Sequence, residues 1–498
     1  MKKILASILF TLSIHVGIAQ TVNIPDANFK NALVSNNSIN TNGDSEIQVS
    51  EAEAFSGLLN VSNRAIADLT GIEAFSNITV LFCNDNQLTA LDLSGNDKLE
   101  SLFGSNNVLT SIDLSNNSLL TTLSIHENQL TSIDLSNNTS LTSLSIYDNH
   151  LTSLNLSTNT ALSSVSCYNN ALTSLDVSTN VDLSQLYCQQ NSITSLDFSQ
   201  NEELEIIWCF ENSLSTLNVT QNMQLKDLRT NQNSLLQLDV ASNTLLETLW
   251  CYNNSLSSLN VSNNTALRNL FFENNGITSI NLTNNTNLKN LRTSSNPLGS
   301  LDISANTQLL SVTCRDNQLS NIDLSENFDL KFFYCENNML TTLDLTQNTF
   351  LDFVYCDFNA LTSIDIRNGF NTDIFEFKAT NNPSLTCIYV DDSSYSTAQW
   401  TSIDSHSSFV ETEAECNTLS TDTTAHINYD VFPNPTSEMI SITSEQEVLS
   451  VKLYSYLGNK LLETTKDTFS VSQLSSGVYI LHIRFANGGF ARKKIVRE

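Results

Sequence analysis

The sequence predicts a mainly β protein, namely a solenoid of about 14 coils of 21 residues followed by a small C-terminal β domain. Asparagine returns at every twenty-first position of the central region, and apolar residues within each period alternate as they do in short strands. After a Thr-rich segment, the last part of the chain shows strand patterns that do not follow this period. A repeat array with end pieces therefore accounts for all 498 residues.

The N-terminus has the plan of a signal peptide. Lys2 and Lys3 precede an apolar stretch, residues 4–19, that ends in small residues. This stretch is shorter than the ~20 residues that a bilayer core requires, and polar residues interrupt it. We expect residues 1–19 to be removed, so that the mature chain starts near Gln20, and no later segment is apolar enough to span a membrane.

The charge of the chain restricts its partners. Lys and Arg total 22 against 52 Asp and Glu, which gives a net charge of −30 and a pI near 4.3. Two of the cations lie in the leader and eight lie from Lys452 onward, so the central array is more acidic than the average. Such a surface repels nucleic acid and anionic membranes and favours cationic or neutral partners and calcium.

The asparagine period indicates a buried ladder of side-chain amides. The members, 21 residues apart, are Asn86, Asn107, Asn128, Asn149, Asn170, Asn191, Asn212, Asn233, Asn254, Asn275, Asn296, Asn317, Asn338 and Asn359. Ten residues after each lies a second asparagine, from Asn96 to Asn348, which Gly369 replaces once. A buried amide must find partners, so we expect each to satisfy backbone groups of its own coil and the neighbouring coil.

Each period contains two related halves. Residues 130–138 and 141–149 both read Leu-x-x-(Leu/Ile)-x-(Leu/Ile)-x-x-Asn. Their apolar residues point into a narrow core that only stacking of coils can close. The pattern resembles the leucine-rich-repeat family, in particular its bacterial nested class of 21-residue units, over residues 81–369. The resemblance implies a parallel β solenoid with little or no helix and ligands that are proteins or glycans.

The C-terminal region carries its own motifs. Residues 432–437 read Phe-Pro-Asn-Pro-Thr-Ser, residues 451–458 read Val-Lys-Leu-Tyr-Ser-Tyr-Leu-Gly, and residues 475–483 read Ser-Ser-Gly-Val-Tyr-Ile-Leu-His-Ile. Together they resemble the type A sorting domain of the bacterial type IX secretion system. The resemblance implies a small β sandwich that the type IX machinery recognises at the outer membrane and that is then cleaved off, which predicts a secreted or cell-surface protein.

These patterns divide the chain into five parts. A signal peptide (1–19) precedes an N-terminal cap (20–57), the solenoid spans 58–390, and a C-terminal cap with linker (391–424) leads to the sorting domain (425–498). The Thr-rich linker itself is residues 417–424.

The N-terminal cap contains a loop that resembles an EF-hand. Its oxygen-bearing side chains are Asn40, Asn42, Asp44, Glu46 and Glu51. This spacing suits a hard cation and predicts a Ca²⁺ site. Asn40 stands where Asp is usual, and Ser45 replaces the glycine of the sharp turn, so a purely structural cap rich in Asn and Asp is the alternative.

Eight of the ten cysteines share one position of the repeat. They are Cys83, Cys167, Cys188, Cys209, Cys251, Cys314, Cys335 and Cys356. We interpret them as small core residues, because side chains stacked in register form a row and not the tetrahedron that zinc requires. Cys387 and Cys416 lie beyond the array and are predicted to form a disulfide.

One half of every coil places Asp or Asn between two core residues, where it points outward. The positions run in steps of 21 from Asp92 to Asp365. A row of carboxylates is a second place where calcium could bind, but exposed carboxylates in water repel each other weakly, so no ion is required.

The other half carries aromatic residues at outward positions. We predict a ligand-binding surface that consists of Tyr187, Trp208, Phe210, Arg229, Trp250, Tyr252 and Phe271, with Tyr334 and Tyr355 further along the array. Exposed aromatic and Arg side chains are typical of recognition surfaces, and we expect a ligand to pair with Arg229. The alternative is that stacked rings only stiffen the sheet.

Three classes of function remain to be compared. The few histidines have no paired nucleophile, zinc spacing or phosphate loop, which argues against an enzyme. A passive structural rod or stalk would gain nothing from outward tryptophans. The sequence therefore favours a secreted or surface protein that binds a protein or glycan through the aromatic face of the solenoid, with the passive rod as the alternative.

Overall fold

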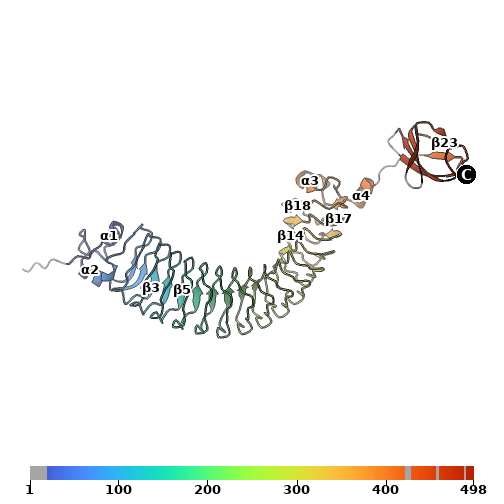
Figure 1. Cartoon of the computed structure of the whole chain (residues 1–498). Coiled ribbons are helices and arrows are strands. Elements are labelled where there is room, and N and C mark those ends of the chain that lie inside the picture. The colour runs from blue at the N-terminus through green and yellow to red at the C-terminus, as the bar shows by residue number, and fades with distance from the viewer. Residues whose placement is uncertain (1–19, 421–427, 456–458, 487–489) are drawn as a thin grey trace, which may run out of the picture. The chain divides into compact units, whose positions relative to one another are not determined.

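The computed structural model describes residues 20–420, 428–455, 459–486 and 490–498 (Figure 1). The predicted signal peptide and the linker residues 421–424 lie outside the described residues. The chain divides into two compact units, residues 1–409 and 410–498, which are described separately. Among the described residues, no helix has the length and apolar character needed to cross a bilayer.

Two short helices close the N-terminal end of the solenoid. Helix α1 (Ala27–Val34) begins at Asp26, whose carboxylate accepts hydrogen bonds from the N–H groups of Asn28 and Phe29. Helix α2 (Val49–Ala54) begins with a capping box formed by Gln48 and Glu51. The 3₁₀ helix η1 (Ile72–Ala74) follows the first strand. These elements bury apolar residues against the first coils, which would otherwise expose the end of the core.

A parallel sheet of 17 strands runs along the array, with each strand paired to the strand of the next coil. Its strands are β1 (Ser56–Asn60), β2 (Asn77–Phe82), β3 (Ser101–Phe103), β4 (Thr122–Ser124), β5 (Ser143–Ser145), β6 (Ser164–Ser166), β7 (Gln185–Tyr187), β8 (Ile206–Trp208), β9 (Asp227–Arg229), β10 (Thr248–Trp250), β11 (Asn269–Phe271), β12 (Asn290–Arg292), β13 (Ser311–Thr313), β14 (Phe332–Tyr334), β16 (Phe353–Tyr355), β18 (Glu376–Ala379) and β20 (Ser402–Ile403). The predicted 14 regular coils are thus extended by irregular end coils.

The opposite side of the coils forms a shorter sheet. It consists of β15 (Thr342–Asp344), β17 (Ser363–Asp365), β19 (Cys387–Tyr389) and β21 (Ser408–Val410). The earlier coils form no such strands among the described residues, apart from one bridge between Asp92 and Asp113. The prediction that both halves of every coil are strands is therefore correct along the array for one half only.

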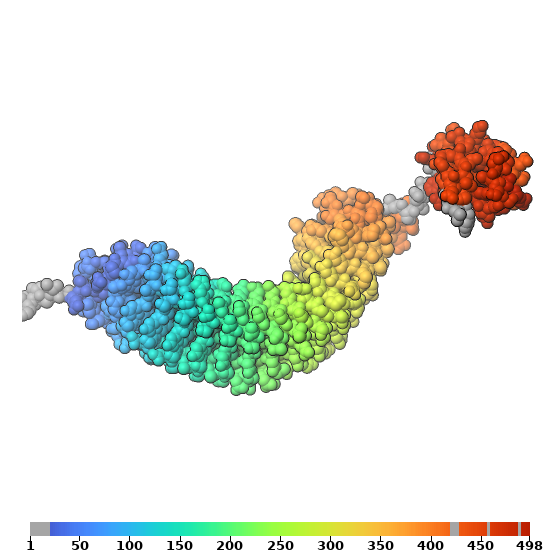
Figure 2. All heavy atoms as spheres, viewed as in Figure 1, coloured from blue at the N-terminus to red at the C-terminus, as the bar shows by residue number. Residues whose placement is uncertain are grey.

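Curvature explains the difference between the two sides. Figures 1 and 2 show the stacked coils of the first unit as an arc, with β14 and β18 on its inner side and β17 on its outer side. A hydrogen-bonded ladder holds strands ~4.8 Å apart, so the side with the continuous sheet has the smaller spacing between coils. The coils fan apart on the other side, where ladder hydrogen bonds are lost. The 17-stranded sheet therefore faces the hollow of the arc.

The asparagine ladders join consecutive coils as predicted. Asn149 donates through Nδ2 to the carbonyl oxygens of Ile125, Ile146 and Tyr147, and its Oδ1 accepts the N–H of Leu130. In the second ladder, Asn138 donates to carbonyl oxygens of the preceding coil. The residue before each member of the first ladder has a φ near +50°, for example 51° at Asp148. The chain thus turns sharply at the end of each strand without glycine.

The C-terminal end of the solenoid is closed by aromatic packing. Trp400 stacks on Phe377 at 4.9 Å between ring centroids and meets Phe409 edge to face. Helices η2 (Asn371–Asp373) and α3 (Ser393–Gln399) lie in this cap. Helix α4 (Glu413–Ser420) extends into the first part of the predicted linker. Glu413 and Glu415 in its first turn favour the helix because carboxylates stabilise helix N-termini.

The second unit is a small β sandwich, as predicted. One antiparallel sheet contains β22 (Tyr429–Phe432), β23 (Met439–Ser444) and β26 (Thr468–Ser470). The other has the order β25 (Lys460–Thr464), β24 (Val448–Ser455), β27 (Gly477–Phe485) and β28 (Phe490–Arg497). The two sheets enclose a core of buried residues such as Ile440, Leu453 and Leu481.

Candidate functional site

The register of the 17-stranded sheet brings most of the predicted surface together. Tyr187, Trp208, Arg229, Trp250 and Phe271 are the third residues of β7 to β11 and are paired neighbours. The middle residue of each strand is buried in the core. These five side chains therefore lie together on the solvent-facing side of the sheet. All five are half-buried, and we call them the aromatic row.

Arg229 holds the centre of the aromatic row. Its guanidinium carbon lies 3.9 Å from the ring centroid of Trp208 and 4.0 Å from that of Trp250. Tyr187 meets Trp208 edge to face at 5.0 Å, and Phe271 stacks on Trp250 at 5.3 Å. The row is therefore a continuous stack in which cation–π and ring contacts cover most ring faces.

The charge of Arg229 has a partner within the chain. Nε donates to Oδ1 of Asp227 at 3.1 Å, and Nη2 donates to Oδ2 at 3.0 Å. Asp227 thus contacts the edge of the planar guanidinium group through two hydrogen bonds, while the two indole rings pack on its two faces. Arg229 thus has an internal partner in Asp227, which is not among the predicted site residues, and its pairing with a ligand stays a prediction.

A second column lies two residues further along the same coils. Phe210 and Tyr252 flank Asn231, which is almost completely buried. Glu273 follows, and burial raises the pKa of its carboxyl group although Arg292 opposes this shift. The 21-residue period places Asn231 and Glu273 in this column, but neither is aromatic or Arg, the residue types on which the predicted surface rests.

Several polar atoms of this region lack a hydrogen-bond partner within the described residues. They are Nε1 of Trp208 and of Trp250, Oδ1 of Asn231 and Oε2 of Glu273. A buried polar group without a partner costs about 1–3 kcal/mol of folding free energy. Two of these atoms, the indole Nε1 atoms of Trp208 and Trp250, belong to the aromatic row itself.

Tyr334 and Tyr355 belong to a separate cluster on β14 to β18. Their rings meet edge to face at 5.0 Å, and Nζ of Lys378 lies 4.0 Å from the Tyr355 ring centroid. Beside them Phe332 stacks on Phe353, and Phe375 packs on Phe353 at a tilt of 46°; these three residues are not among the predicted site residues. Phe375 is 79% exposed, which makes it the most exposed large apolar side chain among the described residues.

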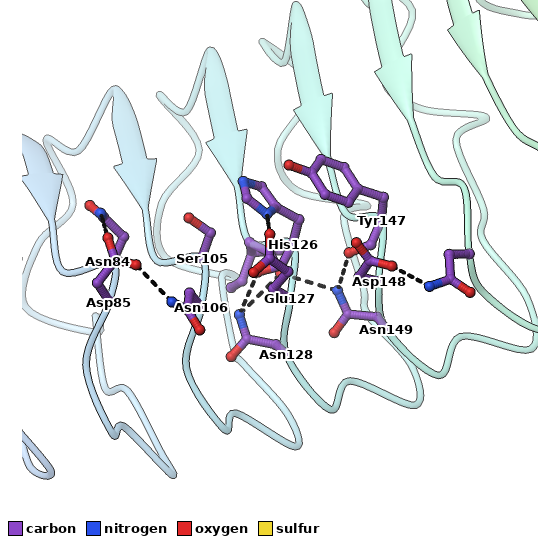
Figure 3. A network of polar contacts seen from close by, with 12 residues as sticks. Asn84, Asp85, Ser105, Asn106, His126, Glu127, Asn128, Tyr147, Asp148 and Asn149 are labelled. Atoms are coloured by element: carbon purple, nitrogen blue, oxygen red, sulfur yellow. Dashed lines mark hydrogen bonds and ion pairs between the residues drawn. The ribbon is translucent and has the colours of Figure 1, made fainter. Parts of the chain in front are cut away.

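A third group of rings lies on the coils of β4 to β6. His126, Tyr147 and Tyr168 stack at 4.1 and 4.2 Å between centroids. Figure 3 shows His126 and Tyr147 next to the turn residues Glu127 and Asp148. Burial lowers the pKa of His126, and the charge of Glu127 opposes this shift. The strand positions beside these rings hold Ser and Thr, so this part of the sheet is flat and polar.

The outward Asp and Asn residues of the opposite side have a structural role. In all fourteen coils, from Asp92 to Asp365, Oδ1 accepts the N–H of the residue two positions later. Asn provides the same acceptor, which explains why the two residues interchange. Among the described residues, no group of three or more His, Cys, Asp and Glu is arranged to hold a metal ion.

The EF-hand-like loop is closed by its own hydrogen bonds. Oε1 of Glu51 accepts the N–H groups of Thr41 and Asn42, and Oε2 accepts the N–H of Gln48. Asp44 accepts from Asn42, Glu46 and Gln48. Asn40 Oδ1 accepts the N–H of Gly43, and Glu46 pairs with Lys30. A calcium ion at this loop, which stays a prediction, would have to displace several of these donors.

The cysteines fall into two groups. The eight in the repeat are free and buried, and burial raises the pKa of Cys167 and of Cys209 to about 12. They are therefore neutral thiols packed in the core. Cys387 and Cys416 are both disulfide-bonded. That they pair with each other stays a prediction.

Comparisons with known proteins agree with these two architectures. Residues 430–498 match the family described as secretion system C-terminal sorting domain. The functional domain of InlJ from Listeria monocytogenes, described as including a cysteine ladder, is 26% identical, with a TM-score of 0.68 over 96% of this chain and 98% of that chain. No curated protein matches the sequence.

Two further solved structures share the fold. An internalin, InlF, from Listeria monocytogenes is 24% identical, with a TM-score of 0.58 over 63% of this chain and 95% of that chain. A leucine-rich-repeat protein of Leptospira interrogans is 22% identical, with a TM-score of 0.53 over 63% and 92% of the two chains. The protein is thus a leucine-rich-repeat solenoid with a C-terminal sorting domain of type IX secretion, which indicates a secreted or outer-surface location.

Proposed function

We propose that this protein is a non-enzymatic binding module whose aromatic row contacts a macromolecular ligand at the cell surface. The observation that carries the proposal is the Trp208–Arg229–Trp250 stack on the inner sheet of the arc. Half-buried rings are concentrated there, whereas the opposite side repeats one turn motif in every coil. Aromatic anchors in such a position are typical of recognition surfaces.

A protein ligand fits this row better than a glycan does. Sugars stack on the faces of aromatic rings, but Arg229 covers one face of each indole and Phe271 covers the other face of Trp250. Ring edges remain for contact, and these pack well against apolar side chains of a partner protein. Residues 20–427 carry 12 Lys and Arg against 45 Asp and Glu, so a partner with Lys or Arg around an apolar centre is favoured.

The proposal is tested by removing rings from one side and charges from the other. We expect Trp208→Ala with Trp250→Ala to weaken capture of extracellular partner proteins at least tenfold, because truncating a central Trp typically costs ~2 kcal/mol or more. Asp197→Asn with Asp239→Asn is the matched control, since Asn keeps the Oδ1 acceptor of the turn. The measurement is quantitative cross-linking of the mature protein to cell-surface proteins.

The passive rod is the second candidate, and the mutual stacking of the row favours it. A row that only stiffens the sheet predicts that the Trp variant melts at a lower temperature than the Asp variant but captures partners equally well. Equal capture by the two variants would therefore contradict the binding module and support the rod. Circular dichroism melting curves on the same samples show whether the array remains folded.

A further inference from the structure

The sorting domain has a sheet face that the fold leaves uncovered. In the sheet β25–β24–β27–β28, alternate residues point to opposite sides. Leu453, Leu481 and Ile483 point inward and are buried in the sandwich core. The register pairs Lys452 with His482 and His482 with Arg492 on the outward side. We call this outward side the basic face.

Positive charge dominates the basic face. Its cations are Lys452, Lys460, Arg484, Arg492 and Lys494. Within the described residues of these four strands, the single carboxylate is that of Glu463, which pairs with Lys452 at 3.1 Å and with Lys460 at 2.6 Å. Arg484, Arg492 and Lys494 are exposed on neighbouring strands, so their charges face solvent.

Apolar and aromatic side chains lie between these cations. Phe490 is 56% exposed on β28, and Tyr454 lies 4.8 Å from His482 between ring centroids. Lys452, Tyr454, His482, Arg484 and Phe490 line an open hollow of about 430 Å³. Burial and the charge of Arg492 lower the pKa of His482, so at neutral pH the charge of the face comes from its Lys and Arg residues.

We propose that the basic face binds an anionic membrane surface. Lys and Arg side chains pair with lipid phosphates, while Phe490 and Tyr454 enter the interfacial region, as aromatic rings do in membrane-surface proteins. An acidic protein would need carboxylates in fixed positions, whereas a lipid surface supplies phosphates across the whole open face. Cations interleaved with rings therefore favour the membrane.

The rest of the chain makes this face distinctive. Residues 428–498 carry 8 of the 22 Lys and Arg residues, although the chain as a whole has a net charge of −30. At physiological ionic strength salt screens charges that are more than about 8 Å apart, so attraction at this face depends on the charges near the contact and not on the net charge of the chain. The contact would hold the uncleaved chain at a bilayer surface, and it is separate from the binding function proposed for the solenoid.

The test uses the full chain from residue 20 to residue 498. Sedimentation with vesicles of phosphatidylcholine, with and without phosphatidylglycerol, measures binding. We expect binding only to vesicles that contain phosphatidylglycerol, with an affinity that falls as salt is raised. Arg484→Gln with Arg492→Gln should reduce this affinity roughly tenfold or more, since each removes one charge from the contact. Phe490→Ala should weaken binding without changing its dependence on salt.

The matched control is Lys466→Gln with Lys493→Gln, which removes two exposed cations of the same domain away from the basic face. We expect a much smaller loss of affinity for this pair. Failure of the wild-type chain to bind anionic vesicles, or an equal loss for the two double variants, would overturn the proposal. The dependence of wild-type binding on phosphatidylglycerol tests the proposal without any variant, so the test remains valid if a variant fails to fold.

Discussion

The sequence and the structure suggest different roles for the side chain of Arg229. As one of the few cations of an acidic array, it is a reasonable ligand contact in the sequence. In the structure two indoles cover its faces and Asp227 holds its edge. A side chain satisfied on three sides fixes the positions of its neighbours, so Arg229 acts by orienting the two tryptophans that a partner would meet.

Glu51 is a second residue whose role the structure specifies. Burial raises the pKa of its carboxyl group, but hydrogen bonds from Gln48, Thr41 and Asn42 lower it more, so the net pKa lies below the ordinary value. A depressed pKa in the folded state stabilises the cap above the unfolded pKa of about 4.3, and this stability is lost as pH falls through the folded pKa.

We therefore predict that Glu51→Gln lowers the melting temperature of the mature protein at pH 7 in the absence of calcium. The reason is that an amide nitrogen cannot accept the hydrogen bonds that one carboxylate oxygen now accepts. Glu53→Gln, an exposed residue of the same helix, is the control and should have little effect. Differential scanning calorimetry measures both.

The same samples test the predicted calcium site. An ion bound at Asn40, Asn42, Asp44 and Glu51 would raise the melting temperature of the wild-type protein when calcium is added, and Glu51→Gln would lose this rise. A difference between Glu51→Gln and wild type that is seen only with calcium present would contradict the structural role of Glu51 as a hydrogen-bond acceptor.

At the scale of elements, the repeats and the caps depend on different information. Each coil needs its neighbour, because its Asn amides donate across the coil boundary and its strand has partners on both sides. The caps lie outside the repeat. Helices α1 and α2 and the Trp400 cluster are therefore held by apolar packing against the terminal coils. The ends therefore contain helices that the repeat pattern does not predict, such as α4.

The C-terminal cap supports a prediction about covalent structure. We predict that Cys387 on β19 and Cys416 on α4 form one disulfide, which would stabilise the fold by roughly 3–4 kcal/mol in the chain-entropy model. Peptide mapping of the secreted protein without reduction tests the pairing. A bridge from either cysteine to one of the eight core thiols, or two free thiols, would contradict it.

At the scale of the whole molecule, the chain combines an acidic solenoid with a sorting domain that has one basic face. The sorting domain indicates export, and the resemblance to type IX substrates implies that the domain is removed afterwards. A protein built in this way loses the basic face together with the domain. Membrane contact and partner binding would then occur at different times.

We predict that the extracellular protein lacks residues 1 to about 19 and also lacks the sorting domain, with cleavage near the end of the 417–424 segment. Intact-mass analysis of the culture medium and of washed cells checks both ends at once. Material that still contains residues 432–498 as the main external species would show that the domain is not removed.

The sequence by itself determined the solenoid, the two asparagine ladders and the sandwich of the sorting domain. The solenoid and its ladders follow from a period, and a period of 21 residues places equivalent side chains next to each other in any stack of coils. The sandwich follows instead from motifs that resemble a known sorting domain. The row from Tyr187 to Phe271 could therefore be assembled from residue numbers alone, as the strand register confirms.

The tertiary structure decided which side of the coils faces the hollow of the arc, how Asp227 pairs with Arg229, and which donors the oxygens of the N-terminal cap loop accept. It also revealed the basic face of the sorting domain. The physical reason is that these properties depend on distances and angles between side chains. A repeat pattern states which residues are neighbours, but hydrogen bonds and ring contacts form only after curvature and rotamers have set those distances.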